Sequence, residues 1–558
     1  MPSLSKWFSG SNEKLSAQTT ATTMVELRED SSSPGEKKQS DEAARNEGEN
    51  SVPLVPMPTA DPRDPLNLPT WRKMAALASL CLFGAMAAAA ELVLGAMLPV
   101  FSFEYAGINP KLLTKVHLPE GVNALTILAE FPGPPIWEIY LLASLPILMM
   151  GATNILLIPL AIATGRRNVL LITGVIALAG CVGSGFSTSL ATHLVCRVIQ
   201  AVGAGTIESL IPFILQDIIF YHQRNAAISV VFATQGLIIV ALGVAAPYVI
   251  GYASWRVIYF ATAGAGLLFW ICLFFFLPET RFERSEDENK GIPAVPLRPG
   301  QNRPDLDHVS YPPRAWTDDI KLFQCKVDWR SGTDALWACF RTFFYPHMLF
   351  VTLLNSAVIA MALAAGYTAA PQLLADPWSW NFYHLGFCLF PLIIAAGASF
   401  LISGWGADRV ANWMARKSGK RNPEFQALNL IIPCFVGLTG CIIFGISGDN
   451  PAEYHWMMFL VGLGMIGFAF LATNTIGIVY VLESYPHLTG PALVNIASFR
   501  LIVAFVLSFR VSEWVAELGY LKTFTMYAGI LGAFILFIPV IYLWGASWRK
   551  RWPALPRN

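Results

Sequence analysis

The segment CRVIQAVGAGTIESLIPF, Cys196–Phe213, decides how the rest of the chain is interpreted. It lies inside an apolar run at about 193–219, and a run of about 20 residues is long enough to cross a bilayer as a helix. Yet this run contains Arg197, Gln200 and Glu208. Because a charge at the centre of a membrane helix costs about 2.5–3.5 kcal/mol on insertion scales, these groups are expected to face the interior of a helix bundle.

The composition agrees with a polytopic membrane protein. Of the 558 residues, 54% are hydrophobic and only 13% are charged, whereas a soluble domain carries about 25% charged residues. The formal net charge of +1 gives no reason to expect nucleic acid as a partner. The cysteines and histidines show no metal-ligand spacing, so no metal or other cofactor is expected.

Twelve apolar runs of roughly 20 to 28 residues divide into two sets of six, and a polar segment separates the sets. We therefore expect an all-α integral membrane protein with twelve transmembrane helices in two six-helix bundles. Its expected parts are a disordered N-terminal tail at 1–73, a first bundle at 74–280, a linker at 281–344, a second bundle at 345–545 and a tail at 546–558.

The Lys and Arg residues of the loops indicate how the helices cross the membrane. If the N-terminus is cytoplasmic, the short inside loops carry eight Lys or Arg and the outside loops carry four, as the positive-inside rule requires. The linker adds positive charge on the same side, as do the basic segments before the first run, at 71–73, and after the last run, at 548–552. Both termini and the linker are therefore expected to be cytoplasmic.

Two loops at matching positions of the two halves carry related residues. The segment ATGRRNVL, Ala163–Leu170, follows the second run, and GWGADRVANWMARKSGKR, Gly404–Arg421, follows the eighth. Together they resemble the Gly-x-x-x-Asp-Arg…Gly-Arg-Arg signature of the major facilitator superfamily, and more narrowly of its fungal drug:proton antiporter-like branch. In the first loop Ile158 and Ile162 stand where that signature has Gly and Asp, so a gating ion pair from that Asp is not expected.

Two further helices carry segments that resemble motifs of the same superfamily. The fourth run resembles its Arg-x-x-Gln-Gly-x-Gly motif, with Ala201 in place of the first Gly, and the fifth resembles a glycine/proline motif of proton-driven exporters. The resemblance implies roles in coupling or gating for the matching residues, although the loop arginines would also serve simply to fix topology. These residues are Arg197, Gln200, Gly165, Arg166, Arg167, Gly404, Asp408, Arg409, Gly243, Pro247 and Gly251.

Polar side chains deep in the other runs are candidates for contact with a substrate or a proton. They are Glu91, Glu208, Arg500, Asn355, Tyr367 and Asn474. Burial disfavours the charged form of a carboxyl group, so Glu208 is expected to exchange a proton, unless it only braces the bundle. Arg500 is expected to be a counter-ion for Glu208 or a site for a substrate anion. If Asn355, Tyr367 and Asn474 do not contact a substrate, they are expected to form hydrogen bonds between helices.

The resemblance implies a proton-coupled secondary transporter that works by alternating access and is not an enzyme. Efflux of a drug, toxin or secondary metabolite is the leading hypothesis, and proton-driven uptake of a cationic amine such as a polyamine is the alternative. A receptor with a transporter fold and a membrane-embedded enzyme are less well supported, since the histidines do not cluster. The expected partners are a small molecule, protons and the bilayer, for a monomer in the cell membrane or in the vacuolar membrane.

Overall fold

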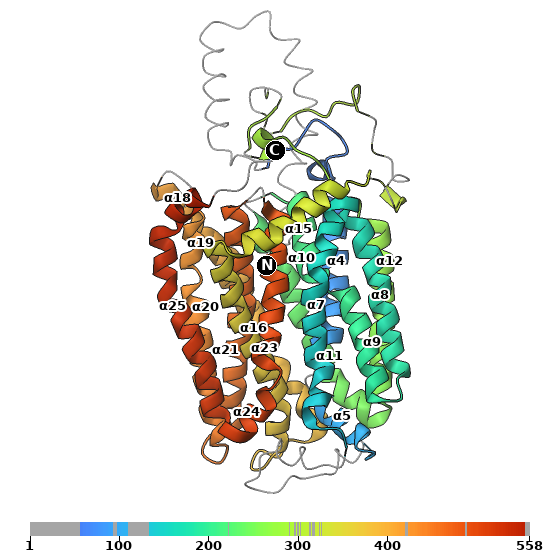
Figure 1. The fold of residues 1–558 in the computed structure, drawn as a ribbon, viewed down its shortest axis with the longest axis vertical. Helices are drawn as coiled ribbons and strands as arrows, with labels where there is room; N and C mark the ends of the chain where they lie inside the picture. Colours follow the sequence, from blue (N-terminus) through green and yellow to red (C-terminus); the bar gives the residue numbers. More distant parts are fainter. Residues whose placement is uncertain are drawn as a thin grey trace, which may run out of the picture.

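The computed structural model describes residues 56–92, 97–109, 133–220, 223–289, 326–418, 422–485 and 488–552, with short pieces of 291–324. Within these residues, twelve helices are long and apolar enough to cross a membrane. They run side by side in two groups, the first six in blue to green and the last six in yellow to red (Figure 1). The predicted all-α fold with two six-helix bundles is therefore confirmed.

The first half contains five continuous membrane helices and one that is divided. The continuous helices are α4 (Thr70–Leu92), α7 (Ile136–Thr164), α8 (Arg166–Phe186), α11 (Arg224–Tyr252) and α12 (Trp255–Phe276). The fourth helix is divided into α9 (Leu190–Ala204) and α10 (Ile207–Ile218). A short helix, α5 (Leu98–Tyr105), follows α4.

In the second half the spans are more often interrupted. The continuous helices are α16 (Pro346–Leu374), α21 (Trp456–Ser484) and α25 (Tyr520–Arg551). The eighth span joins η5 (Phe382–Leu389), α17 (Phe390–Ser399), η6 (Phe400–Gly406) and α18 (Ala407–Ser418), and the ninth joins α19 (Glu424–Leu428) and α20 (Ile431–Asp449). The eleventh joins α22 (Thr489–Val494), η8 (Asn495–Phe499), α23 (Arg500–Ser508) and α24 (Val511–Leu518).

Small residues bring helices of the two halves close together. A Cβ added at Gly151 of α7 would lie 2.7 Å from the carbonyl oxygen of Ser498 in η8. A Cβ added at Gly386 of η5 would lie 2.4 Å from the carbonyl oxygen of Gly243 in α11. Such contacts are typical of membrane helices, in which small residues let the backbones approach. The second span therefore packs on the eleventh, and the fifth packs on the eighth.

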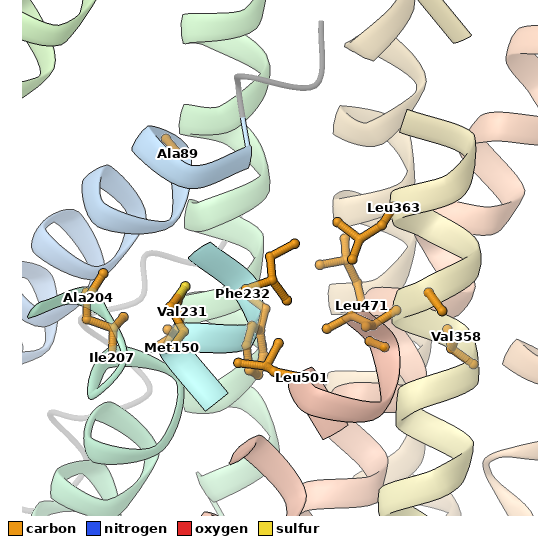
Figure 2. Packing of buried hydrophobic residues seen from close by; sticks show 14 of the residues in the cluster. Ala89, Met150, Ala204, Ile207, Val231, Phe232, Val358, Leu363, Leu471 and Leu501 are labelled. Atoms are coloured by element: carbon orange, nitrogen blue, oxygen red, sulfur yellow. The ribbon is translucent and has the colours of Figure 1, made fainter. Parts of the chain in front are cut away.

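Buried apolar side chains fill the space between the two halves. One cluster contains Met150 of α7 and Phe232 of α11 from the first half, together with Leu471 of α21 and Leu501 of α23 from the second (Figure 2). Polar groups placed in this region are surrounded by packed hydrocarbon rather than by water. Their electrostatic interactions are correspondingly strong.

The segment before the first helix differs from the expected disorder at residues 56–73. Asp64 forms an ion pair with Arg284 of the linker, with 2.5 Å between Oδ1 and Nη2, and both side chains are buried. Asp64 also accepts hydrogen bonds from the backbone N–H groups of Thr59 and Leu66. The ion pair with the linker and the hydrogen bonds within the segment order residues 56–73. The rest of the tail, residues 1–55, lies outside the described residues.

The linker contains a helix that touches both halves. This helix, α15 (Trp329–Phe343), lies across one end of the two bundles, which we call the linker side (Figure 1). At its start the Asp328 N–H donates to the carbonyl oxygen of Ala163 over 3.0 Å. At its end Thr342 Oγ1 accepts from Asn495 Nδ2 of η8 over 2.8 Å. The helix therefore joins the second span to the eleventh.

Candidate functional site

Glu208 lies in the first turn of α10, next to a break in the fourth span. The break separates α9 from α10 at Gly205 and Thr206. Pro212, four residues after Glu208, has no N–H and cannot donate to the Glu208 carbonyl group. Arg197 and Glu208 therefore lie in two separate helices, α9 and α10, rather than in one continuous helix.

The Glu208 carboxylate is paired with a cation of the other half. Arg500 Nη2 lies 2.5 Å from Glu208 Oε2, and the exposed fractions of the two side chains are 1% and 15%. The Arg500 guanidinium also donates through Nη1 to Asn474 Oδ1 of α21. A charge-assisted bond in a buried setting is strong, and this one joins the two bundles.

The three partners lie at one depth. Glu208 and Asn474 each lie ten residues before the linker-side ends of their spans, Ile218 and Ser484, and Arg500 lies ten residues after the start of its span at Gly490. At 1.5 Å per residue this places them about 15 Å from the linker side. These spans have 29 residues each, so the group lies on the linker side of the middle of the spans.

A π-helical turn, η8, directly precedes Arg500. Such single turns within α-helices are rare and occur frequently at functional sites. Here the turn brings the Ser498 carbonyl group against Gly151 of α7 and leaves Arg500 at the start of α23. The local backbone thus places the guanidinium at the boundary between the halves, which hydropathy alone does not predict.

The remaining candidates for substrate contact lie near this group or toward the opposite end. Asn355 of α16 is buried, and a Cβ added at Gly477, one turn from Asn474, would lie 2.8 Å from its Nδ2. Tyr367 makes an edge-to-face contact with Tyr140 of the first half, with 6.2 Å between the ring centroids. Glu91 belongs to α4, but its side chain lies outside the described residues.

Two buried residues near Glu208 were not predicted. Asn154 of α7 donates through Nδ2 to Ser209 Oγ, so the second span is fixed to the helix that carries Glu208. Asn154 Oδ1 has no hydrogen-bond partner in the part of the chain that the structure describes. A polar residue in the middle of the second apolar run was the available signal, since buried amides in membrane helices usually bond to a neighbouring helix.

Arg197 and Gln200 lie together inside the first half. Arg197 is fully buried, donates through Nη1 to Gln200 Oε1 over 2.8 Å and through Nε to the Leu142 carbonyl oxygen over 3.3 Å. These contacts hold α9 against α7. The pair therefore acts within one bundle, in line with a structural or coupling role for Arg197.

The loop after the second span is fixed by Glu279, which the sequence analysis did not select. The Glu279 carboxylate accepts from the backbone N–H groups of Arg166 and Arg167 over 3.0 and 3.2 Å. Gly165 has a φ of +113°, and a Cβ there would lie 2.6 Å from a Glu279 oxygen. A carboxylate is favourable at a helix N-terminus, so Glu279 caps the start of α8.

The two loop arginines make their contacts within the first half and with the linker. The Arg167 guanidinium is buried and donates to the carbonyl oxygens of Phe274 and Leu277 at the end of α12, and to Lys321 of the linker. Arg166 pairs with Asp217 at the end of α10, with 3.4 Å between Nε and Oδ2. Cations are favourable at helix C-termini, so these residues fasten three helices on the linker side.

Where the family signature has Asp, the chain makes an apolar contact between the halves. A Cβ added at Gly490 of α22 would lie 2.7 Å from Ile162 Cδ1 and 3.6 Å from Phe213 Cζ. Ile162 lies in the last turn of the second span, which ends at Thr164, and Gly490 begins the eleventh span. The linker-side contact is therefore made by apolar packing at this position.

The matching loop of the second half also touches the first half. A Cβ added at Gly404 of η6 would lie 2.8 Å from Ser229 Oγ of α11. The Arg409 guanidinium lies over the Trp405 ring, 3.4 Å from its centroid, and Asp408 follows η6 in the first turn of α18. Gly404 thus permits a linker-side contact between the fifth and eighth spans.

The glycine/proline segment of the fifth span packs against the eighth span at the opposite end. Gly243 meets Gly386 as described above, and a Cβ at Gly251 would lie 2.3 Å from Tyr383 Cε1. Pro247 lies within α11 between these glycines. The two halves therefore touch on both sides of the ion pair, and any pathway to it requires one set of contacts to open.

In the ranges that the structure describes, no group of three or more His, Cys, Asp or Glu side chains could hold a metal ion.

The sequence model of the Major Facilitator Superfamily matches residues 122–506 of the chain. The chain belongs to this superfamily. Its predicted kinship with fungal transporters of the superfamily is confirmed, and it is a transporter of small molecules rather than an enzyme.

Relatives and solved structures of the superfamily cover most of the chain. The MFS-type transporter C1271.10c of Schizosaccharomyces pombe is 22% identical over an alignment of 546 positions, which covers 90% of this chain and 89% of the relative. The efflux pump vrtL of Penicillium aethiopicum is 23% identical over an alignment of 424 positions, which covers 73% of this chain and 76% of vrtL. The proton:xylose symporter XylE of E. coli aligns with a TM-score of 0.54 at 13% identity over 85% of this chain and 96% of XylE, a likeness of fold alone.

Proposed function

We propose that the chain is a proton-coupled transporter that exports a small organic molecule by alternating access, with Glu208 as the proton-carrying group. The observation that carries this proposal is the buried ion pair between Glu208 of the first half and Arg500 of the second. The pair joins the two bodies that move in alternating access, so its making and breaking is linked to that movement.

The chemistry of the pair supplies the coupling. A deprotonated Glu208 attracts Arg500 and holds the two halves together at this depth. A proton on Glu208 removes its charge, and the attraction that opposes separation of the halves is lost. Separation of the halves leaves a charged Glu208 without its partner, which costs free energy, whereas a protonated Glu208 has no charge to compensate. Protonation of Glu208 and separation of the two halves therefore favour one another.

The contacts on either side of the pair are the proposed gates. On the linker side these are the contacts of Gly490 with Ile162 and of Gly404 with Ser229, and at the opposite end the contact of Gly386 with Gly243. Opening of one set while the other stays closed would expose the pair to one side at a time. Arg166 and Arg167 keep the first half rigid during this movement, and Asp408 and Arg409 are proposed to do so for the eighth span.

Efflux is favoured over uptake of a cationic amine. The Glu208 carboxylate is already compensated by Arg500, so a cationic substrate would have to displace that guanidinium. The name of vrtL, an efflux pump, supports export.

We further propose that the chain acts as a monomer in the cell membrane. Both termini and the linker are proposed to lie in the cytoplasm, because Lys and Arg are concentrated in the loops of that side.

Growth of yeast depleted of its own transporters tests this proposal. Cells that express the chain are expected to resist one or more toxic organic compounds and to retain less of the compound than control cells. A protonophore should abolish the difference, and Glu208→Gln should do so at an unchanged surface level. Export that persists in full with the protonophore would refute proton coupling.

A further inference from the structure

The linker helix α15 packs against the two bundles with small side chains. Its buried residues recur at intervals of three and four, so they form one face of the helix. These residues are Gly332, Ala335, Cys339 and Thr342. A helix of a soluble protein usually buries its large apolar side chains, and this buried face of α15 has none.

The large apolar side chains of α15 lie on the opposite face. Trp337 is 76% exposed, Trp329 and Phe340 are also exposed, and so is Phe344, which directly follows the helix. At 100° per residue, Trp337 points directly away from the centre of the buried face. Because an exposed apolar patch marks an interaction surface, this face is expected to have a partner.

Two arginines border the aromatic face along one edge. Arg330 and Arg341 are exposed, and at 100° per residue they lie about 20° and 40° round the helix from Trp337. The other exposed aromatic residues of the helix lie to the opposite side of Trp337, about 60° and 80° away. Asp334 is also exposed beside the arginines, so this edge keeps a net positive charge.

The helix lies beside the spans rather than beyond their ends. A Cβ added at Gly332 would lie 3.1 Å from the carbonyl oxygen of Pro159, five residues before the end of the second span at Thr164. The ring centroids of Phe343 and Phe499 are 4.2 Å apart, and Phe499 comes nine residues after the start of the eleventh span. At 1.5 Å per residue, these contacts lie about 8 and 14 Å from the linker-side ends of the two spans.

This depth corresponds to the boundary between the headgroups and the acyl chains of a bilayer. A span of 29 residues is about 44 Å long. A bilayer is about 40–45 Å thick with its headgroups, and its hydrocarbon core is about 30 Å thick. About 7 Å at each end of such a span therefore lies among headgroups. The exposed face of α15, which points away from the bundles at this depth, meets headgroups and upper acyl chains.

We infer that the exposed face of α15 binds the phospholipid leaflet on the linker side of the membrane. Its aromatic side chains lie among the upper acyl chains, at the level where Trp is enriched in membrane proteins. Arg330 and Arg341 extend to the phosphate groups, with their aliphatic stems along the apolar surface. An amphipathic helix with aromatic residues and cations binds a membrane surface in this way. The inference concerns a surface outside the transport pathway and goes beyond the proposed function.

A leaflet fits this face better than a protein partner does. A soluble partner would have to enter the bilayer to reach a face that lies at the depth of the spans. A second copy of the chain that met the first through this face would bring two identical cationic edges near one another, which is unfavourable. Phospholipids offer acyl chains to the aromatic side chains and phosphate groups to the arginines.

Spin labels on the full-length protein in phosphatidylcholine nanodiscs test the inference. One label is placed on the proposed surface, at Trp337→Cys, and another in the linker at Val309→Cys, where the native side chain is 98% exposed. Both variants are made in a background without reactive cysteines. Relaxation of each label is measured with oxygen, which concentrates in hydrocarbon, and with a nickel chelate, which stays in water.

The chelate should relax the label at Trp337→Cys several-fold less than the label at Val309→Cys, and oxygen should relax it more. Phe344→Cys should behave in the same way, and it decides the matter if Trp337→Cys is not recovered folded. A label on this face that the chelate reaches as readily as the linker label would overturn the inference, because the face would then lie in water. Weak relaxation by both reagents would overturn it as well, because a second copy or another part of the chain would then cover the face.

A double variant, Trp337→Glu with Phe344→Glu, tests whether the aromatic side chains hold the helix in the leaflet. A label at Phe340→Cys should become several-fold more accessible to the chelate in this variant, since charges among acyl chains are unfavourable. Val309→Glu is the matched control and should leave that label unchanged. Unchanged accessibility in the double variant would overturn the inference.

Discussion

Arg500 of the second half lies 2.5 Å from Glu208 of the first, in a region packed with apolar side chains. The two residues are 292 positions apart in the chain, and each comes from a different bundle. The contact exists only in an arrangement that brings the fourth and eleventh spans together, so it reports directly on the relative position of the halves.

The two members of the pair should differ in what their loss costs. Glu208→Leu leaves a buried guanidinium that cannot lose its charge, and removal of one partner of a buried pair costs about 3–5 kcal/mol. Arg500→Leu leaves a carboxyl group that takes a proton, so its cost should be smaller. Thermal unfolding of the purified variants at neutral pH measures the difference. The double variant should be more stable than Glu208→Leu; a double variant that shows the sum of both losses would contradict coupling.

Gly386→Ala should bias the protein toward opening at the end opposite the linker. The added Cβ would lie 2.4 Å from the Gly243 carbonyl oxygen and 2.5 Å from Val244 Cα, and a backbone cannot move aside as a side chain does. A cysteine in place of the buried Tyr140 should then react faster with an impermeant thiol reagent, in a background without Cys388. Gly529→Ala is the control, since a Cβ there meets nothing within 4 Å. Equal labelling rates in the two variants would argue against this gate.

Glu279→Ala should destabilise the first half. The carboxylate caps α8 through the N–H groups of Arg166 and Arg167, and loss of a helix N-cap costs about 0.5–2 kcal/mol. The thermal midpoint of the purified variant should fall, whereas Glu283→Ala, at a side chain that is 86% exposed, should have little effect. A thermal midpoint of Glu279→Ala that matches the wild type would rule out the cap as a stabilising contact.

The start of α15 should loosen in acid. The pKa of Asp328 is lowered because its carboxylate accepts hydrogen bonds from the Ser331 hydroxyl group and from the Ser331 N–H. A carboxyl group whose pKa is lower in the folded state stabilises that state above its unfolded pKa, about 3.9. This contribution is lost as the pH falls through the folded value.

A spin label at the exposed Thr333 should therefore be immobile at neutral pH and become mobile as the solution is acidified below about pH 4. In Asp328→Ala the label should be mobile throughout, because the cap is missing at every pH. A label in the wild type that stays immobile across the same range would show that Asp328 does not hold the helix start.

The hydropathy pattern was sufficient to predict the fold, because each membrane helix appears in the sequence as an apolar run of its own. The division into two bundles was predicted from the polar segment between the two sets of runs. Glu208 was selected because it is a charged residue within one of those runs. The last helix was predicted to end near residue 545 and continues to Arg551, because Arg549 pairs with the buried Glu424 over 2.6 Å. From the sequence alone, the basic residues at the end of the last run indicate a tail, because the sequence does not show that Arg549 has Glu424 as a partner.

The candidate site was only partly accessible from the sequence. Arg500 was proposed as a counter-ion for Glu208 or as an anion site, and no sequence pattern distinguishes these, since the choice depends on how two distant helices cross. Glu279 was missed because its partners are backbone N–H groups, which have no sequence signal. The break of the fourth span at Gly205 and the proline at 212 were not used, because hydropathy shows only one continuous apolar run there.

The central claim is that Glu208 carries the proton that drives transport. Reconstituted vesicles that hold an exported compound test it in two modes: accumulation driven by a pH gradient, and exchange of labelled for unlabelled compound without a gradient. Glu208→Gln should lose the first mode and keep the second, because exchange needs the halves to move but no proton to be released. A variant that still accumulates the compound with the pH gradient as the wild type does would contradict the account.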